Sequence, residues 1–342
     1  MSTVGFGRVL GAAIISAAIA GALAVSPASA QKVTIKLGHP LTPGTGLHQW
    51  ALFLKEGLEK RAPGKFDFKI FPTSQLGSIP RMIEGAQLGT IEMIEMPPEF
   101  FTGVDQRYGM ITAPGILHNL THGQRVLHDP EFKKAFWPIG EAKGLKMVGM
   151  SCDGPSDYAT VKPINKLEDF TGRKLRVFGS PLEIETLRRV GATGVPMPLS
   201  EVIPAIQQKV IDGNKAAISV FVPFKYQSVA KHVLIAKESL ICINKMASKA
   251  WFDQLPPDLQ KILLEESAKA DEKILPWNIA LIKKLYGVWT NTGGVLTEFS
   301  PQDDAEFRRR VSSVGDDVFK SQPDVLKMYN LMKAVAARTP KE

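Results

Sequence analysis

The order in which strand-like and helix-like patterns follow one another constrains the fold of this chain most. Apolar residues alternate over 33–37, recur at helical spacing over 47–58, and alternate again over 66–70. A second helical stretch over 81–88 stops at Gly89 and leads into the apolar run IEMIEM. Strands that alternate with helices in this way predict a mostly parallel sheet with helices on both faces.

The same pattern returns in the second half of the chain. Strands are predicted over 145–151 and 174–178, and helices over 182–190 and 201–210. The fold class predicted for the whole chain is therefore α/β.

The C-terminal part is largely helical. A helical segment that starts at Pro256 reaches about Thr290, and Ser300, followed by Pro301, is typical of the N-cap of another helix. No linker rich in Pro, Gly or Ser separates two halves, so we expect two domains joined by strands that cross between them. The candidate crossings are residues 153–159 and 236–244.

Residues 1–30 have the features of a secretory signal peptide. Arg8 precedes an apolar, Ala-rich run from 9 to about 25, and Ala28-Ser29-Ala30 fits a cleavage site after Ala30. A membrane anchor is the alternative, but the run is at the short edge for a span and Pro27 ends it. No Cys follows the site, so a lipoprotein anchor is not supported. The 342-residue chain less 30 leaves 312 residues, which suits roughly two domains of ordinary size.

The formal net charge of +8 comes from basic residues scattered along the chain. Aromatic residues are not interleaved with them as they are in nucleic-acid-binding surfaces, so no nucleic-acid partner is expected. Solvated helix faces explain most of these charges, with a mild bias toward anionic solutes.

One arginine stands in an apolar strand, where a charge needs a partner. Arg176 lies between Leu175 and Val177, and alternation along a strand puts it on the same face as Phe178. The following Ser180-Pro181-Leu182-Glu183 has the pattern of a helix start with a capping box. A guanidinium beside a helix N-terminus is suited to a carboxylate or a phosphate. The alternative is a structural ion pair with Glu183 or Asp169.

Several motifs resemble one known family. The stretches KLRV, GATGVPMPLSEVIPAIQQKVIDG and FKYQSVAKHV are similar to those of DctP-type solute-binding proteins of TRAP transporters. The similarity also includes VTIKLGHPL, FKIFPTSQLGS, EGAQLGTIEM and CINKMASKAWFDQLPPDLQKIL, in order over nearly the whole mature chain.

This resemblance implies a two-lobed periplasmic-binding-protein fold, with a ligand cleft between lobes joined by crossing strands and a long C-terminal helix. The lobes are expected at 31–153 plus about 243–300, and at 154–242 plus part of the C-terminal helical region. The implied function is a periplasmic receptor, not an enzyme, that delivers a small organic acid to TRAP membrane subunits and is monomeric. The alternatives are a receptor for a membrane sensor and an exported α/β hydrolase.

The resemblance also gives Arg176 a role, because the arginine of this motif pairs with the carboxylate of the solute in the family. Two other positions depart from the family pattern. Ser156 stands where many members carry a second arginine in a G-x-R motif, and Ala216 stands where many carry an asparagine. A pocket that keeps one arginine and loses polar neighbours fits a monocarboxylate with an apolar or aromatic body, unless Lys215, Asn214 or Tyr158 takes over.

Other candidate ligand contacts come from motif position, strand alternation and the carboxyl edge of the predicted sheet, with core packing as the alternative for most of them. They are Phe178, His39, Glu95, Met96, Ser156, Met197, Leu199, Asn214 and Phe221.

No metal or cofactor site is expected. His118, His122 and His128 are close in sequence but lack the H-E-x-x-H pattern, and the glycines of 38–46 do not complete a dinucleotide fingerprint. No nucleophile elbow, P-loop or C-x-x-C is present, which disfavours the hydrolase.

The two cysteines, Cys152 and Cys242, lie in apolar, strand-like segments. They form a disulfide if those strands are neighbours, and two buried free thiols are at least as compatible with the sequence.

Overall fold

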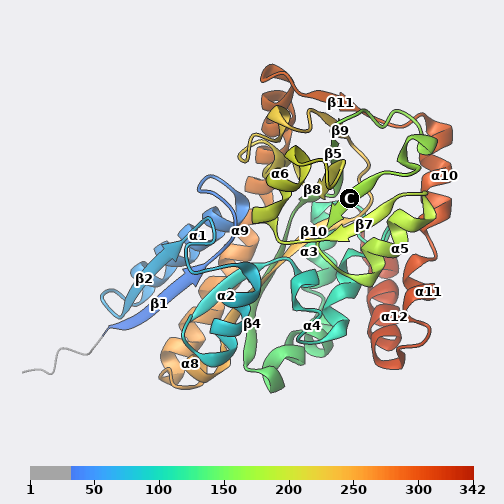
Figure 1. The fold of residues 1–342 in the computed structure, drawn as a ribbon. Helices are drawn as coiled ribbons and strands as arrows, with labels where there is room; N and C mark the ends of the chain where they lie inside the picture. The colour runs from blue at the N-terminus through green and yellow to red at the C-terminus, as the bar shows by residue number, and fades with distance from the viewer. Residues whose placement is uncertain (1–31) are drawn as a thin grey trace, which may run out of the picture. The chain divides into compact units, whose positions relative to one another are not determined.

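A computed structural model describes residues 32–342, so the predicted signal peptide and its cleavage site lie outside the described residues. Two β-sheets with helices around them make up this part of the chain (Figure 1). The α/β class predicted from the sequence is therefore confirmed.

The first sheet has five strands and the second has six. The first runs in the order β2 (Phe66–Phe71), β1 (Val33–Gly38), β3 (Met93–Met96), β10 (Leu240–Ser248) and β4 (Leu145–Pro155). The second runs in the order β11 (Val295–Thr297), β9 (His232–Leu234), β5 (Asp157–Thr160), β8 (Gly213–Ala216), β6 (Lys174–Val177) and β7 (Thr193–Pro196).

Both sheets are mixed, which corrects the expectation of a mostly parallel sheet. Strand β1 is parallel to β2 and β3, and β6 is parallel to β7 and β8. Strand β10 is antiparallel to β3 and β4, and β5 is antiparallel to β8 and β9. The reason is that β4 and β10 carry the chain out of the first sheet and back into it, so they run in opposite directions.

Twelve α-helices and five short 3₁₀ helices lie within residues 32–342. The α-helices are α1 (Gly46–Arg61), α2 (Ile79–Leu88), α3 (Leu120–Leu127), α4 (Pro130–Phe136), α5 (Pro181–Arg189), α6 (Leu199–Gln207), α7 (Ile218–Phe221), α8 (Lys249–Asp253), α9 (Pro257–Asn291), α10 (Pro301–Val311), α11 (Val314–Phe319) and α12 (Pro323–Arg338). The 3₁₀ helices are η1 (Pro98–Phe101), η2 (Gln106–Thr112), η3 (Trp137–Lys143), η4 (Leu167–Phe170) and η5 (Tyr226–Ser228).

The long predicted helix is a single helix, α9, of 35 residues. It packs on α1 and β4 and, further along, on α7 and β11, so it contacts strands of both sheets. As a result β11, which lies in the stretch 243–300 predicted for the first lobe, pairs with β9 in the second sheet. None of the helices in residues 32–342 is both long enough and apolar enough to cross a membrane.

The two crossings lie side by side. The first is at 155–157, between β4 and β5, and the second is at 235–239, between β9 and β10. Backbone hydrogen bonds join them, from Ser156 N to Ser239 O at 2.8 Å and from Glu238 N to Ser156 O at 3.3 Å. Next to this junction Cys152 and Cys242 form a disulfide between β4 and β10, which decides the alternative that the sequence left open.

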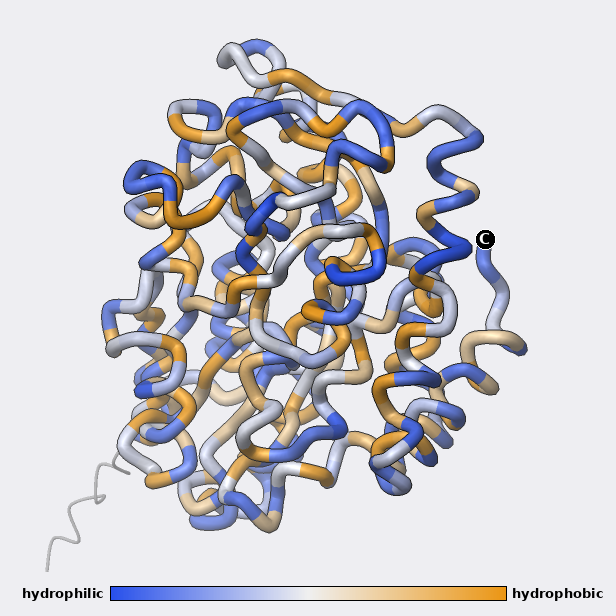
Figure 2. The backbone as a smooth tube through the Cα atoms, turned by 45° about the vertical axis from the view of Figure 1, so that its right-hand side comes forward, coloured by the Kyte–Doolittle hydropathy of each residue, from blue (hydrophilic) through white to orange (hydrophobic). Residues whose placement is uncertain are grey.

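The packing follows the hydropathy pattern of the sequence. Hydrophilic and hydrophobic residues alternate along the outer helices (Figure 2).

Ser300 accepts a hydrogen bond from Asp303 N at the start of α10, as the N-cap pattern predicts.

Candidate functional site

Strand β6 and the turn after it fix the position of Arg176. Leu175 and Val177 are fully buried on one face of the strand, so Arg176 lies on the other. Gly179 continues the chain with a φ of 121°, a conformation that favours glycine. Ser180 then caps α5 and forms the predicted capping box with Glu183.

Glu183 takes up the amide donors of this turn. Its Oε2 accepts hydrogen bonds from the backbone N–H groups of Phe178 and Gly179, both at 3.1 Å, and of Ser180 at 3.4 Å. These three backbone donors are therefore not available to a ligand.

Arg176 is a buried charge, with 1% of its surface exposed. Its Nε donates to Met197 O at 3.0 Å and its Nη1 donates to Asn214 Oδ1 at 3.4 Å, whereas Nη2 has no partner. The guanidinium carbon lies 4.5 Å from the ring centroid of Phe178, a distance typical of a cation–π contact.

No acidic residue among 32–342 forms an ion pair with Arg176. Glu183 pairs instead with Lys215 Nζ at 3.3 Å, and Asp169 accepts hydrogen bonds from the backbone N–H groups of Asn165 and Lys166. Burial lowers the pKa of the Arg176 guanidinium below its usual value, since a buried charge loses its hydration. The structural ion pair offered as an alternative is thus absent from the described residues.

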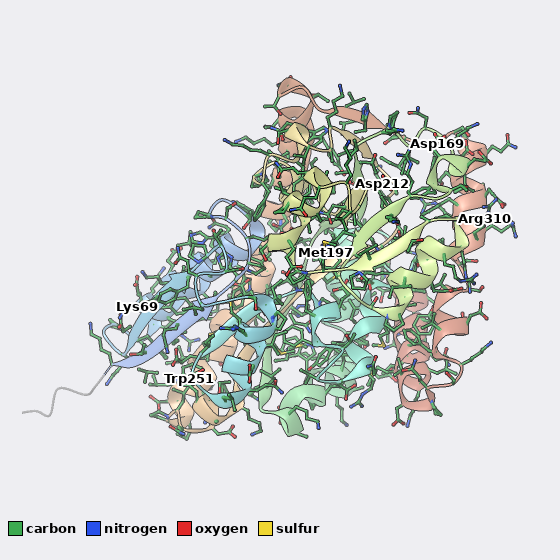
Figure 3. The ribbon with its side chains drawn as sticks, in the orientation of Figure 1. Lys69, Asp169, Met197, Asp212, Trp251 and Arg310 are labelled. Carbon is green, nitrogen blue, oxygen red and sulfur yellow. A yellow bond between two sulfur atoms is a disulfide. The ribbon has the colours of Figure 1, made fainter. Side chains whose placement is uncertain are left out.

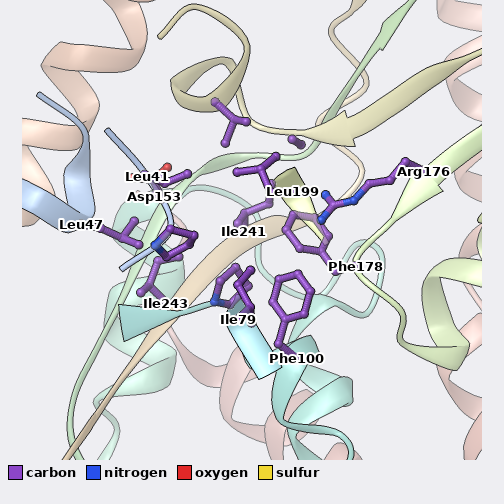
Figure 4. Close-up of a pocket in the computed structure, with 14 residues that line it drawn as sticks. Leu41, Leu47, Ile79, Phe100, Asp153, Arg176, Phe178, Leu199, Ile241 and Ile243 are labelled. Atoms are coloured by element: carbon purple, nitrogen blue, oxygen red, sulfur yellow. The ribbon is translucent and has the colours of Figure 1, made fainter. Parts of the chain in front are cut away.

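A narrow pocket opens in front of Arg176 (Figure 4). The cavity volume of this pocket is about 30 Å³. Arg176 and Asp153 are the charged residues of its lining, and twelve apolar residues make up the rest. They are Pro40, Leu41, Leu47, Ile79, Pro97, Phe100, Phe178, Leu199, Ala216, Val220, Ile241 and Ile243.

Five of the predicted residues meet at one end of this pocket. Arg176, Phe178 and Leu199 line it. Met197 and Asn214 accept hydrogen bonds from Arg176. The site lies near the centre of the molecule, since Figure 3 shows Met197 there and Lys69 and Arg310 at the edge.

The other predicted residues lie outside this lining. Met96 and Phe221 are fully buried in the core, while their chain neighbours Pro97 and Val220 reach the pocket. Ser156 is fully buried at the crossing, where its hydroxyl has no partner.

His39 and Glu95 also lie behind the lining. His39 contacts His48, with 3.1 Å between Nε2 and Nδ1, and burial and His48 lower the pKa of His39 to about 3. Glu95 lines a smaller cavity beside the pocket, together with Asp153.

Sequence reasoning missed most of the apolar lining. Ile241 and Ile243 come from β10, which returns from the second sheet, and Phe100 comes from the 3₁₀ helix after β3. The available signals were the crossing at 236–244 and the carboxyl edge of the strand that ends at Met96.

A buried ion network lies behind Arg176. Lys215 Nζ is 2.9 Å from Glu238 Oε1 and 3.3 Å from Glu183 Oε1, and all three side chains are at most 2% exposed. The Tyr158 hydroxyl donates to Glu238. Lys215 and Tyr158 are therefore engaged with protein groups rather than with the pocket.

Within residues 32–342, no cluster of three or more His, Cys, Asp or Glu side chains is arranged to hold a metal ion.

Comparison with known proteins identifies similar sequences. Residues 37–322 match the family described as bacterial extracellular solute-binding protein, family 7, DctP. The C4-dicarboxylate-binding periplasmic protein DctP of Rhodobacter capsulatus is 29% identical over 273 residues, 78% of this chain and 79% of that protein. The 2,3-diketo-L-gulonate-binding periplasmic protein YiaO of Escherichia coli is 27% identical over 253 residues, 74% of this chain and 77% of that protein.

Solved structures share the fold. A TRAP periplasmic solute-binding protein from Desulfovibrio salexigens, with bound orotic acid, matches with a TM-score of 0.85 and 24% identity over 90% of this chain and 99% of that one. One from Shewanella oneidensis, with bound succinate, matches with a TM-score of 0.83 and 22% identity over 89% and 99%. The two-lobed fold expected from the sequence is thereby confirmed.

Proposed function

Because this chain belongs to the DctP family of bacterial extracellular solute-binding proteins, which are binding proteins of transporters and not enzymes, we propose that it binds an organic acid through Arg176. Its relatives are named for binding C4-dicarboxylates and 2,3-diketo-L-gulonate, and its structural neighbours hold orotic acid and succinate. The function that fits these relatives is to bind an organic acid in the periplasm and to pass it to TRAP membrane subunits.

The buried, unpaired guanidinium carries the proposal. Arg176 has lost its hydration and has no carboxylate partner among the described residues, while its Nη2 lacks a hydrogen bond. A buried charge without a partner is costly, and an arginine binds a carboxylate with short, charge-assisted hydrogen bonds. A carboxylate of the solute would supply both the missing charge and the missing acceptor.

The lining supports an apolar or aromatic monocarboxylate. Ala216 lines the pocket where an asparagine would offer a polar contact, and the hydroxyl of Ser156 is buried away from it. The guanidinium lies over the ring of Phe178, and Phe100 and Leu199 provide further apolar surface. A second carboxylate of the solute would find no second cation in this lining.

Both sheets contribute to the lining, which supports closure around the solute. Ile241 and Ile243 come from β10 in the first sheet, and Arg176 and Ala216 come from β6 and β8 in the second. We place the hinge at the two adjacent crossings, with lobe I at 31–153 plus about 243–300 except β11, and lobe II at 154–242 plus β11 and part of the C-terminal helical region. A ligand that contacts both lobes only when they are closed shifts the population toward the closed form.

A thermal-shift screen tests the proposed function. Each acid is paired with its primary amide, which keeps the shape and removes the charge. Apolar and aromatic monocarboxylates should raise the unfolding midpoint with concentration, since they bind the folded protein, whereas the amides should not. Shifts by dicarboxylates alone would refute the monocarboxylate, and equal shifts by acids and amides would refute the carboxylate contact itself. The screen uses protein that lacks residues 1–30, which we propose to be cleaved after Ala30, and a sedimentation measurement checks that it is a monomer.

A further inference from the structure

We propose that Asp153 determines specificity at the end of this pocket opposite Arg176. The solute is then a monocarboxylate that carries a hydrogen-bond donor remote from its carboxylate. This donor is a hydroxyl or an ammonium group. This inference rests on the proposed function, since Arg176 must hold the carboxylate for the other end to reach Asp153.

The two charged residues of the lining stand apart. Arg176 and Asp153 lie on opposite sides of the pocket, with Leu199, Ile241 and Phe178 between them (Figure 4). A solute in this pocket therefore meets the guanidinium of Arg176 at one end, apolar surface along its body and the carboxyl group of Asp153 at the other end.

Asp153 has one oxygen without a donor. Ser219 donates its hydroxyl to Asp153 Oδ2, whereas Asp153 Oδ1 has no hydrogen-bond partner. The side chain is buried, with 3% of the residue exposed, so bulk water does not compensate for the missing bond. A buried acceptor without a donor is costly, and buried polar groups in folded proteins are nearly always paired.

Asn278, which lines the smaller cavity beside the pocket together with Asp153, presents a second acceptor there. Its Nδ2 donates to Cys152 O at 3.0 Å, which fixes the orientation of the amide and leaves Oδ1 without a partner. A Cβ atom on Gly46 would collide with both Asp153 Oδ1 and Asn278 Oδ1, so the two oxygens converge on the glycine at the start of α1. Both oxygens are therefore acceptors without a donor that pack against Gly46.

The groups behind Asp153 do not supply that donor. Lys245 Nζ pairs with Asp271 Oδ1 at 3.0 Å and also donates to Ser151. Glu95, fully buried beside Asp153, has two oxygens without partners, and burial raises the pKa of its carboxyl well above the usual value. The unpaired Asp153 Oδ1 therefore favours a hydrogen-bond donor of the solute at this end of the pocket.

Five acids of matched length test the inference by calorimetry: hexanoate, 6-hydroxyhexanoate, 6-aminohexanoate, 3-phenylpropanoate and 3-(4-hydroxyphenyl)propanoate. Within each series, at least one donor-bearing acid should bind at least about tenfold more tightly than its parent, the gain expected for one hydrogen bond to a charged group. The hydroxyl and ammonium arms show which donor the site prefers. Adipate, which places a carboxylate at Asp153, should bind less tightly than hexanoate.

The variant Asp153→Asn keeps the shape and can still accept from Ser219. It should lose the advantage of the donor-bearing acids and leave their parents unchanged. The control Asp67→Asn, at a half-buried carboxylate of β2 that pairs with Lys69, should alter nothing. Parents that bind as tightly as their derivatives, or an Asp153→Asn variant that weakens both alike, would overturn the inference and leave the proposed function standing. The wild-type comparison decides the matter alone if the variant does not fold. Absence of binding by all five acids would also overturn it, and the wider acid-and-amide screen then judges the proposed function separately.

Discussion

Replacing Lys215 with methionine should destabilise the protein strongly. The Lys215 ammonium is the partner of two carboxylates, Glu238 at 2.9 Å and Glu183 at 3.3 Å, and the three side chains are almost fully buried. Methionine fills a similar volume but carries no charge, so both carboxylates lose their cation. Breaking a buried ion pair on one side costs about 3–5 kcal/mol, because the remaining charge stays buried without compensation. Glu183 keeps its three backbone donors, which places the expected loss toward the lower end of that range.

Urea unfolding followed by circular dichroism measures this loss as a change in the free energy of unfolding. The matched control is Lys249→Met, because Lys249 pairs with Asp253 at the surface and should not change stability measurably. The double variant Lys215→Met with Glu238→Gln should recover part of the loss, since it removes one of the two stranded charges. A loss below about 1 kcal/mol for Lys215→Met, or no recovery in the double variant, would refute the assignment of this network as a coupled buried triad.

Two further perturbations test other buried groups. Burial and the neighbouring Glu183 raise the pKa of Glu99 from 4.5 to about 8, so the folded state holds its proton more tightly than the unfolded chain and wild-type stability falls as pH rises through this window. The free energy of unfolding of Glu99→Gln should therefore match that of the wild type near pH 5. The difference in favour of the variant should then grow by at most about 1.4 kcal/mol per pH unit up to pH 8. Urea titrations that give the same difference at every pH would contradict this. Removing the disulfide by Cys152→Ala with Cys242→Ala should cost about 4–5 kcal/mol, given the loop of 90 residues that it closes, and an unchanged urea midpoint would argue against that stabilisation.

Local chemistry explains which parts of the fold the sequence predicted. Ser180 and Ser300 cap helices where their patterns indicated, because a cap depends on residues within one turn. The absence of a linker between two halves predicted crossing strands, and the candidate crossings 153–159 and 236–244 overlap the observed ones at 155–157 and 235–239. The antiparallel course of β10 was not anticipated, since strand direction depends on where the chain returns from.

In the site, too, local patterns predicted some residues and tertiary packing determines the others. Strand alternation placed Arg176 and Phe178 on one face, and both line the pocket. Met96 was predicted at the carboxyl edge of its strand and Phe221 from motif position. Each is one residue away from a lining residue, Pro97 or Val220, and a one-residue step along a strand or helix changes the face. Asp153 joins the pocket only through tertiary packing of β4, which no local pattern in the sequence reports.

The affinity of Arg176→Ala for the acid that binds the wild type most tightly tests the central claim most directly. Isothermal titration should show a loss of at least about tenfold to a hundredfold, as expected for hydrogen bonds to a charged group, while circular dichroism shows an intact fold. The control Arg188→Ala removes an arginine that is exposed on α5 and pairs with Glu185, so it should bind as the wild type does. Wild-type affinity in a folded Arg176→Ala variant would contradict the claim that this buried guanidinium holds the carboxylate of the solute.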